Sequence, residues 1–225
     1  MGVQQYEFQK LRQGLITETK RKIAESVGKD FLISQAIAAI AELDKVINTL
    51  TTRLREWYGL YNPELSHRHT DYEYFIKAVL NDSTTTTEMG GTLSSNDTAQ
   101  LKRYAQKIYA LIEEKQELLS YIDETMKDFC PHVHVVAGTL IGAKLIAQKG
   151  TLKELAFMPA STIQLLGAEK ALFRHLKTKS RSPKYGYIMH HPSVMQAQNK
   201  GKAARQLANK IATAAKQDYF HDKTE

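Results

Sequence analysis

The chain has 225 residues, 42% of them hydrophobic and 24% charged, which is typical of a folded protein of one or two domains. No run approaches the roughly 18 consecutive apolar residues of a membrane helix, and the start of the chain is too polar for a secretory signal. The lone Cys130 excludes an intrachain disulfide and a cysteine-rich zinc site, so we expect a half-buried free thiol in an intracellular protein.

Two helices are predicted in the first quarter of the chain from apolar residues at helical spacing. A leading helix over residues 6–27 is indicated by Tyr6, Phe8, Leu11, Leu15, Ile23 and Val27. The next segment has apolar residues at all eight core positions of four heptads, which is typical of a coiled coil. These seam positions are Ile33, Ala36, Ile40, Leu43, Ile47, Leu50, Leu54 and Trp57. Asp30 is expected to cap this helix, and Gly59 with Asn62-Pro63 to end it.

A second long helix is predicted over residues 98–129, opened by Asn96 or Asp97. Its heptad seam is interrupted at Lys115 and Thr125. Each long helix would measure at most about 48 Å at 1.5 Å per residue. Because their lengths are similar and a connection joins them, an antiparallel helical hairpin is predicted.

The connection between the long helices contains a short predicted helix at residues 71–80. It is followed by a low-complexity stretch at 81–96, rich in threonine, which is expected to be a flexible tip. Four consecutive threonines favour a strand, but no neighbouring segment could pair with it.

Composition changes after Cys130-Pro131, where the chain becomes small and apolar. Gly138 and Gly142 lie one helical turn apart there, a spacing that would let another helix approach closely. Shorter helices are then separated by Gly150, Pro159, Gly167, Pro183 and Pro192. The chain is therefore predicted to be all-α, with a coiled-coil domain at residues 1–132 and a compact helical domain at 133–225.

Charge is concentrated in one C-terminal stretch. Residues 170–217 carry eleven of the 31 lysines and arginines and none of the 24 aspartates and glutamates. Basic side chains without interleaved acids create a positive field that attracts an anion. Residues 177–191 alternate them with hydroxyls, tyrosines and histidines, which suits phosphate contacts and stacking on unpaired bases. A solvated surface is the alternative, but such surfaces usually mix signs, so nucleic acid is predicted, with RNA favoured over DNA.

Two metal- or phosphate-binding patterns are considered and set aside. Gly138–Lys144 superficially resembles a phosphate-binding loop, but three rather than four residues separate its glycines, so helix packing is favoured. Cys130, His132, His134 and the pair His190-His191 supply possible zinc ligands. Structural zinc sites usually need tight ligand pairs with several cysteines, so no metal is predicted.

No catalytic constellation stands out either. The candidate nucleophiles are Ser161, Ser180, Ser182 and Ser193. They lack the glycine context of a nucleophile elbow, and the basic stretch has no paired carboxylates. Glu169, the only acid between Glu154 and Asp218, is expected to orient a lysine or a partner. We therefore predict neither an enzyme nor a cofactor. For His190-His191, contact with RNA and a split into one packed and one solvated ring are equally favoured.

Long motifs in the C-terminal half resemble those of the Nop domain family. They are Pro159-Ala-Ser-Thr-Ile-Gln-Leu-Leu-Gly-Ala-Glu-Lys-Ala-Leu-Phe-Arg174, Pro183-Lys-Tyr-Gly186, His190-His-Pro192 and Gly201-Lys-Ala-Ala-Arg205. The resemblance covers about residues 133–220, and Leu54-Arg-Glu-Trp-Tyr-Gly59 is similar to the family's coiled-coil domain. The family includes core proteins of archaeal and nucleolar box C/D ribonucleoproteins and the spliceosomal factor of the U4/U6 particle. The Gly167–Phe173 string resembles the archaeal branch more than the spliceosomal one.

The resemblance implies a non-catalytic scaffold that binds a kink-turn RNA together with a small ribosomal-protein-like kink-turn binder. Such scaffolds belong to box C/D particles, which guide RNA 2′-O-methylation during rRNA processing. It implies that phosphates and bases are faced by Lys170, Arg174, Lys184, Tyr185, His190, Lys202, Arg205 and Lys216. The residues implied to face the protein partner are Gln164, Gly167, Ala168 and Glu169. The small residues Gly167 and Ala168 would let the partner approach closely.

Archaeal relatives usually carry an N-terminal domain that recruits the methyltransferase fibrillarin. This sequence starts almost directly at the coiled coil, as a natural short form or as a piece of a longer protein, so fibrillarin recruitment is in doubt for it. Surplus apolar surface on the Ile33–Trp57 helix predicts a homodimer, unless residues 6–27 cover that surface. The expected location is cytoplasmic in an archaeal cell and nucleolar or nuclear in a eukaryotic one.

Three alternative functions are kept. The chain could be a U4/U6-type pre-mRNA splicing protein, or a coiled-coil interaction module whose basic surface binds acidic protein and no RNA. An RNA-modifying enzyme is the third, and the lack of any cofactor-binding loop counts against it.

Overall fold

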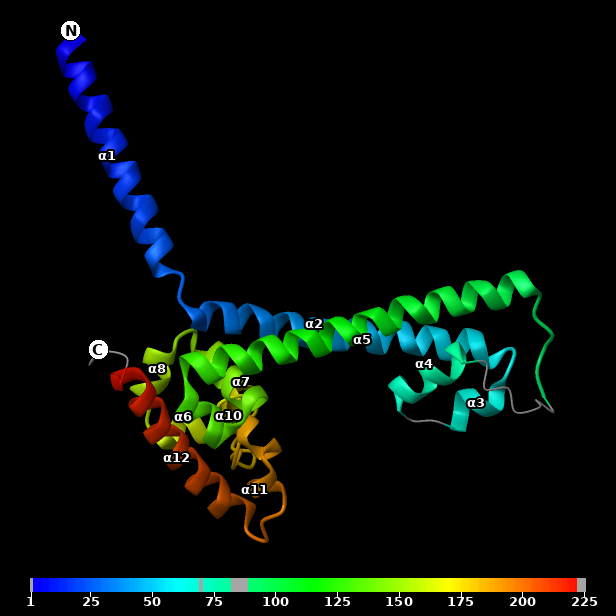
Figure 1. Cartoon of the computed structure of the whole chain (residues 1–225). Coiled ribbons are helices and arrows are strands. Elements are labelled where there is room, and N and C mark those ends of the chain that lie inside the picture. The colour runs from blue at the N-terminus through cyan, green and yellow to red at the C-terminus, as the bar shows by residue number, and fades with distance from the viewer. Residues whose placement is uncertain (1, 69–70, 82–88, 222–225) are drawn as a thin grey trace. The chain divides into compact units, whose positions relative to one another are not determined.

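The computed structural model describes residues 2–68, 71–81 and 89–221, and the regular secondary structure in these ranges is all helical (Figure 1). This confirms the predicted all-α class. No helix in these ranges is both long and apolar enough to span a membrane. The helices are α1 (Gly2–Ser26), α2 (Lys29–Gly59), α3 (Pro63–Arg68), α4 (Tyr72–Leu80), α5 (Ser95–Phe129), α6 (Pro131–Ala137), α7 (Thr139–Lys149), α8 (Leu152–Ala156), α9 (Ala160–Leu165), α10 (Glu169–Thr178), the 3₁₀ helix η1 (Tyr187–His190), α11 (Pro192–Met195) and α12 (Lys200–His221).

The structure divides into two compact units, one of residues 36–128 and one of residues 1–35 with 129–225. The first unit contains most of α2 and α5 together with α3 and α4. The second contains α1, the start of α2 and the helices from α6 to α12. The domain boundary predicted after residue 132 lies near the second junction and stays a prediction.

Within residues 36–128, α2 and α5 run antiparallel, as predicted. Asp44 Oδ1 of α2 lies 2.6 Å from Lys115 Nζ of α5, and further along α2 the Trp57 ring lies 6.3 Å from that of Tyr104. Residue numbers therefore rise along α2 while they fall along α5. The predicted interruption at Lys115 is a polar layer in the hairpin. Burial lowers the pKa of Lys115, but its bonds to Asp44 and to the Tyr72 hydroxyl, 3.4 Å away, outweigh burial and raise it.

The buried face of α2 differs from the predicted seam in one of its two rows. The first predicted row is buried throughout, at Ile33, Ile40, Ile47 and Leu54. In the second row only Ala36 is buried, and the residues that are merely half-buried are Leu43, Leu50 and Trp57. One residue later, Thr51 and Tyr58 are buried in place of Leu50 and Trp57, and Ile37 is buried next to Ala36. Around the last of these, α4 joins the same core, so α2 is covered by more than one helix, whereas a two-stranded coiled coil covers only one seam.

α3 and α4 pack back on α2. Arg55 Nη1 donates a hydrogen bond to the Ser66 carbonyl (2.9 Å), and the Ser66 hydroxyl donates one to the Arg55 carbonyl (3.1 Å). The Arg55 guanidinium also lies over the Phe75 ring, 4.4 Å from its centre. Asp71 caps α4 by accepting a hydrogen bond from the Glu73 N–H (2.8 Å). The predicted short helix at residues 71–80 is therefore confirmed.

Four helix starts differ from the prediction. α1 begins at Gly2, whereas the leading helix was predicted from residue 6. α2 begins at Lys29, one residue before its predicted cap. Asn62, expected only to end α2, accepts a hydrogen bond from the Leu65 N–H (2.9 Å) and so opens α3, a helix that the sequence patterns did not predict. α5 starts earlier than predicted because Ser94 and Asp97 form a capping box, in which the Asp97 N–H donates to Ser94 Oγ (3.2 Å).

Part of the predicted flexible tip cannot be compared with the structure. Residues 82–88, which include the four threonines, lie outside the described residues. Residues 89–94 are described and are not helical, and Gly91 there donates its N–H to the Leu60 carbonyl (2.9 Å).

α12 is the central helix among those that follow residue 129. α6, α8, α9 and α11 all pack against it. The buried hydrophobic face of α12 consists mainly of alanines, at positions Ala204, Ala208, Ala214 and Ala215, together with Leu207 and Ile211. Small side chains let the surrounding short helices approach α12 closely, so its other faces remain available for solvent and ligands.

Gly138 does not lie inside a helix, so the predicted packing of a Gly138–Gly142 pair is wrong. Its φ of +75° and its N–H bond to the His134 carbonyl (2.9 Å) end α6, and α7 begins at the next residue. Left-handed backbone of this kind is accessible to glycine at little cost. Gly142 alone is buried within α7.

Asp218 near the end of α12 caps α6. Its carboxylate accepts hydrogen bonds from the N–H groups of His132 (3.0 Å) and Val133 (2.8 Å) and contacts His132 Nδ1 (2.6 Å). Cys130 just before α6 is fully buried, whereas a half-buried thiol was predicted. Burial, and then the charge of Asp218, raise the pKa of the Cys130 thiol to about 12. Such a thiol is inert at neutral pH.

Candidate nucleic-acid interface

All eleven lysines and arginines of residues 170–217 are exposed. Within the described part of the chain, none of them forms an ion pair with a carboxylate. The two acids that border this stretch are engaged elsewhere, Glu169 with the Gly167 N–H (2.9 Å) and Asp218 with α6. The folded protein therefore keeps the unneutralised positive field that the sequence predicts.

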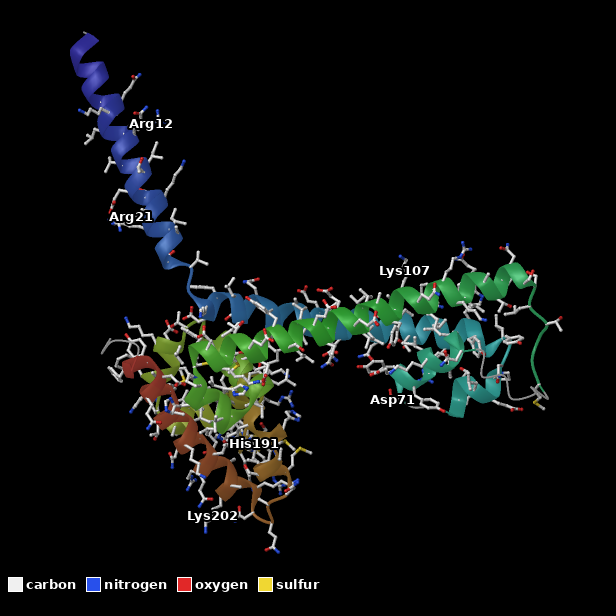
Figure 2. The ribbon with its side chains drawn as sticks, in the orientation of Figure 1. Arg12, Arg21, Asp71, Lys107, His191 and Lys202 are labelled. Carbon is white, nitrogen blue, oxygen red and sulfur yellow. The ribbon has the colours of Figure 1, made fainter. Side chains whose placement is uncertain are left out.

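Four of these basic side chains line one open groove of about 1220 Å³, which we call the basic groove. Its walls come from α9, from the segment before η1 and from the start of α12, where Lys202 is labelled in Figure 2. The charged lining residues are Arg181, Lys184, Lys202 and Arg205. The neutral polar ones are Ser161, Gln164, Ser182, Asn199, Gln206 and Asn209. No carboxylate lines the groove, so it suits a polyanion that also presents hydrogen-bonding groups.

The start of α12 positions one wall of the basic groove. The Lys202 N–H donates to Asn199 Oδ1 (3.1 Å), which fixes the first turn. Lys202, Arg205 and Asn209 are spaced by three and four residues and so project from one face of the helix. The exposed N-terminus of the helix adds a partial positive charge on the same side.

Another wall is a loop that is hydrogen-bonded to the end of α9. Gln164 Nε2 donates to the Lys184 carbonyl (2.6 Å), the Gly186 N–H to the Gln164 carbonyl (2.8 Å), and the Tyr187 N–H to the Leu166 carbonyl (2.7 Å). A Cβ on Gly186 would collide with the Leu166 carbonyl oxygen, so this close approach requires glycine. Lys184 is therefore presented from a fixed backbone.

The turn between α9 and α10 contains Gly167 and Ala168, and the other two residues predicted to face a protein partner flank it, Gln164 in α9 and Glu169 at the start of α10. Gly167 has a φ of +88°, and a Cβ there would lie 2.8 Å from the Tyr187 ring. The Tyr187 hydroxyl donates to Gln148 Oε1 (3.2 Å), and burial, followed by the charge of Glu169, raises the pKa of Tyr187. Tyr187 thus has a structural role in supporting this turn. Whether the turn also faces a partner stays a prediction.

α10 presents its side chains to solvent. Lys170 and Arg174 lie one turn apart and share a face, and neither lines the basic groove. Phe173 and Leu176 on the same helix are also exposed, and no residue of α10 is fully buried. His175 Nδ1 contacts the Ser180 carbonyl, and Lys179 adopts a left-handed conformation that ends the helix.

The two adjacent histidines have different environments. His191 Nδ1 accepts a hydrogen bond from the Ser193 N–H (3.2 Å) and so caps α11, and burial lowers its pKa. His190 is exposed. The pair therefore divides into one packed and one solvated ring, which leaves His190 available for the predicted RNA contact.

The basic groove brings together only part of the predicted site. It unites Gln164, Lys184, Lys202 and Arg205. The predicted RNA-facing residues outside it are Lys170, Arg174, Tyr185, His190 and Lys216. Lys216 follows Lys202 by about 21 Å along α12, at 1.5 Å per residue. Arg181, missed by the prediction, lines the groove, and its place in the acid-free stretch could have indicated it. Asn199 and Asn209 also line the groove, but they are uncharged, so the charge pattern of the sequence could not indicate them.

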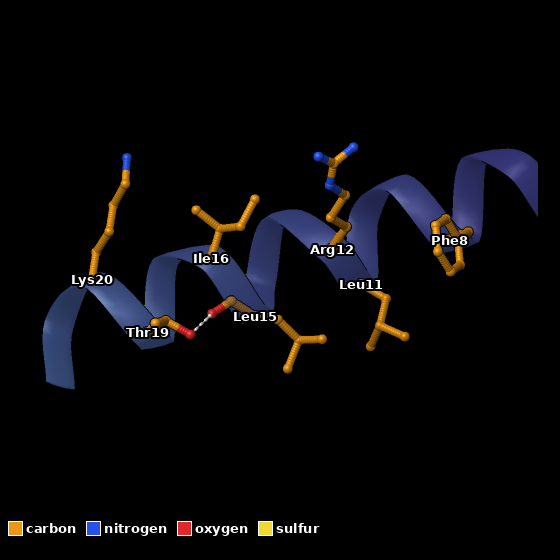
Figure 3. A pocket seen from close by; sticks show the side chains of 7 residues that line it. All are labelled: Phe8, Leu11, Arg12, Leu15, Ile16, Thr19 and Lys20. Carbon is orange, nitrogen blue, oxygen red and sulfur yellow. Dashed lines mark hydrogen bonds between the residues drawn. The ribbon is translucent and has the colours of Figure 1, made fainter. Parts of the chain in front are cut away.

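Two other places were considered for a site. Among the described residues no three histidine, cysteine or acidic side chains are grouped as metal ligands. A shallow apolar hollow of about 330 Å³ lies on α1, between Phe8, Leu11, Leu15 and Ile16 (Figure 3). In that view the Thr19 hydroxyl is bonded to the carbonyl of its own helix (2.7 Å). The hollow has side chains of one helix only, and no convergent polar groups that would define a ligand site.

A helical domain with an acid-free, backbone-anchored basic groove has the surface chemistry that suits a polyanion. The Nop family model, described as "snoRNA binding domain, fibrillarin", matches residues 39–84 and 77–225. A NOP5 family protein of Methanocaldococcus jannaschii is 38% identical over 244 residues, which cover 96% of this chain and 59% of that protein. Nucleolar protein 56 of Caenorhabditis elegans is 38% identical over 226 residues, covering 86% of this chain and 45% of that protein. The chain belongs to the Nop family, and it spans about half the length of the curated relatives it matches.

The solved structure of a fibrillarin/Nop5p complex contains a chain with the same fold. The match has a TM-score of 0.57 and 24% sequence identity, and it covers 95% of this chain and 70% of that chain. Both the coiled-coil hairpin and the helical domain therefore belong to a fold already seen in this family.

Proposed function

We propose that this chain is a non-catalytic RNA-binding scaffold of a box C/D-type ribonucleoprotein. It would bind a kink-turn RNA together with a small ribosomal-protein-like kink-turn binder. The observation that carries the proposal is the basic groove, whose four cationic side chains form no ion pair with a carboxylate of the described residues. Phosphate groups would supply the missing negative charge, and the amide side chains of the groove could bond to sugars or base edges.

The arrangement around the groove supports a composite RNA and protein surface. Gln164 lines the groove, and directly after α9 follow the turn that contains Gly167 and then Glu169, the first residue of α10. A protein seated on that turn would therefore lie next to RNA held in the groove. Because the turn is fixed by its contact with Tyr187, little ordering would be needed on binding.

The decisive experiment is a binding assay with kink-turn RNA, with and without the small kink-turn binder. We expect a ternary complex that is tighter than either binary complex. Lys184→Ala and Arg205→Ala should each weaken it and reduce the slope of log K against log salt by about 0.7–0.9 per lost phosphate contact. Lys210→Ala is the matched control, since Lys210 is exposed on α12 but does not line the groove.

Failure to form any ternary complex would remove this proposal. Unchanged affinity and salt slope for both groove variants would place the RNA elsewhere on the chain. Binding of an acidic protein in the absence of RNA would favour the coiled-coil interaction module. Running the assay with box C/D and U4/U6 kink-turns separates the box C/D role from the splicing role.

Further partners and the location are proposed on the strength of the relatives. The family description names fibrillarin, and the solved relative is in complex with it, so we propose a fibrillarin-type protein as a partner. Retention of fibrillarin by the immobilised chain would test this. The eukaryotic relatives are named nucleolar proteins, and the archaeal one comes from a cell without a nucleolus. A nucleolar location is proposed for a eukaryotic source and a cytoplasmic one for an archaeal source.

A further inference from the structure

Three aromatic rings meet on the surface where the end of α12 contacts the end of α8. Phe157 follows directly after α8, and Tyr219 and Phe220 lie in the last turn of α12. Their ring centres are 5.2 to 6.0 Å apart, and their planes are tilted by 70 to 76°. Phe157 is 63% exposed and Phe220 51% exposed. These rings support one another edge to face and still present aromatic surface to solvent, so we call them the aromatic platform.

Exposed lysines border the aromatic platform on both of its helices. Lys153 precedes Phe157 by four residues, and Lys216 precedes Phe220 by four. Neither lysine forms an ion pair in the described part of the chain. Glu154, which is next to Lys153 in the sequence, is exposed and is not paired with either lysine. Aromatic surface flanked by unneutralised cations matches the chemistry of unpaired nucleotides, which combine a flat base with a negative backbone.

One face of α12 connects the basic groove with the aromatic platform. Steps of three or four residues along the helix keep side chains within one face. The exposed side chains in this row are, in order, Lys202, Arg205, Asn209, Thr213, Lys216 and Phe220. The row is about 27 Å long at 1.5 Å per residue. The only acid of α12 is Asp218, which is buried against α6, so no negative side chain of this helix interrupts the row.

From this continuity we propose that the aromatic platform stacks unpaired bases of single-stranded RNA that leaves the basic groove. The backbone of the strand follows the acid-free row of α12 and reaches Lys216, and its bases stack on Phe157 and Phe220. The inference rests on the proposed function, because it requires RNA in the groove. It adds a second binding site, with unpaired nucleotides as its ligand class.

The test compares two forms of a kink-turn RNA in the presence of the small kink-turn binder. One form has blunt ends, and the other carries a single-stranded oligouridine extension of about 12 nucleotides, on either strand in turn. For the wild-type chain, we expect one extension to tighten binding by about 5-fold or more, the effect of stacking one base. The Phe157→Ala/Phe220→Ala variant should lose this gain and still bind the blunt RNA normally.

Two further variants sharpen the experiment. Phe157→Leu/Phe220→Leu keeps an apolar surface without a ring, and stacking predicts that it also loses the gain. Phe8→Ala is the matched control, because Phe8 is 67% exposed on α1 and lies outside the platform, so it should keep the gain. Circular dichroism melting of each variant checks that it is folded.

The possible results separate the two proposals. If the blunt RNA binds and neither extension adds affinity, the platform proposal is overturned and the groove proposal stands. If neither RNA binds, both fall. Full retention of the gain by either double variant excludes base stacking. If the alanine variant changes the mass in light scattering or the capture of a protein partner while keeping the gain, the platform is a protein interface, and the proposal is likewise overturned.

Discussion

Gly167 illustrates how a single residue in this protein is determined by a partner distant in the sequence. Its φ is positive, and a Cβ at this position would lie only 2.8 Å from the Tyr187 ring, so both features require the absence of a side chain. The family resemblance attributed the small residue to close approach of another protein. The structure provides an internal reason, which would hold in the free chain as well.

We therefore expect Gly167→Ala to destabilise the fold by about 1–3 kcal/mol, the usual cost of a strained backbone position or a forced ring displacement. Urea denaturation measures it. Gly14→Ala is the control, since Gly14 lies in α1 with no atom within 4 Å of its Cβ position. At a helical site of that kind alanine should stabilise by about 0.5–1 kcal/mol. Equal effects of the two substitutions would contradict the role given to Tyr187.

Cys130 leads to a pH-dependent prediction. Its pKa rises from an ordinary value of 9.0 to about 12 in the folded state, first through burial and then through the charge of Asp218. Between those values the unfolded chain has lost a thiol proton that the folded chain retains. The contribution of the Cys130 thiol to the free energy of unfolding should therefore be fully present below pH 9. It should fall as pH rises toward 12, by up to about 1.4 kcal/mol per pH unit.

The measurement compares urea unfolding of the wild type and Cys130→Ala between about pH 8 and 10.5. Lysines and tyrosines titrate in the same range, so only the difference between the two proteins isolates Cys130. We expect the wild type to lose stability more steeply than the variant above about pH 9. If the free energy of unfolding had the same pH dependence in both proteins, the folded protein would tolerate the thiolate of Cys130.

At the scale of elements, two helices that follow residue 129 are capped by residues at different distances along the sequence. α8 is capped locally, because Thr151 Oγ1 accepts a hydrogen bond from the Glu154 N–H (3.1 Å). α6 has no side-chain cap from its own N-cap residue, Cys130, and is capped by Asp218 of α12 instead. The end of α12 is thereby attached to the start of α6.

Asp218→Ala should cost about 2–4 kcal/mol, because the N–H groups of His132 and Val133 lose their acceptor and one of them is buried. Thr151→Ala, which removes the local cap of α8, should cost only about 1 kcal/mol. Thermal melting of both variants makes the comparison. A loss for Asp218→Ala no larger than that for Thr151→Ala would show that solvent replaces the carboxylate easily.

At the scale of the whole molecule, the prediction of a homodimer concerns the unit of residues 36–128. Leu43, Leu50 and Trp57 are half-buried, and Val46 on the same helix is exposed. An apolar strip of this kind on a helical hairpin is suited to a symmetric contact with a second copy. Two copies would hold two RNA-binding domains together, and an RNA with two kink-turns would then gain avidity.

Light scattering on the purified chain tests this directly. We expect a mass that rises above 25.5 kDa toward twice that value as concentration increases. A mass that stays at 25.5 kDa up to about 100 μM would exclude the dimer and leave the RNA proposal intact.

The sequence by itself determined the features that depend on near neighbours along the chain. Helical periodicity predicted α1, α2, α4 and α5 because a helix places residues three and four apart on one face. The absence of acids from residues 170–217 predicted the positive surface because charge is a property of the residues themselves and does not change with packing. The motif strings around Gly167 indicated the family, which the comparisons confirm.

Only the tertiary structure decided which of these residues meet. The burial of Tyr58 in place of the predicted Trp57 follows from the packing of α4 against the same core. The basic groove combines three segments that lie between Ser161 and Asn209, and the aromatic platform joins Phe157 to Phe220. Spacing along the chain carries no information about such contacts, because they arise only when separate short helices pack around the same buried face of α12.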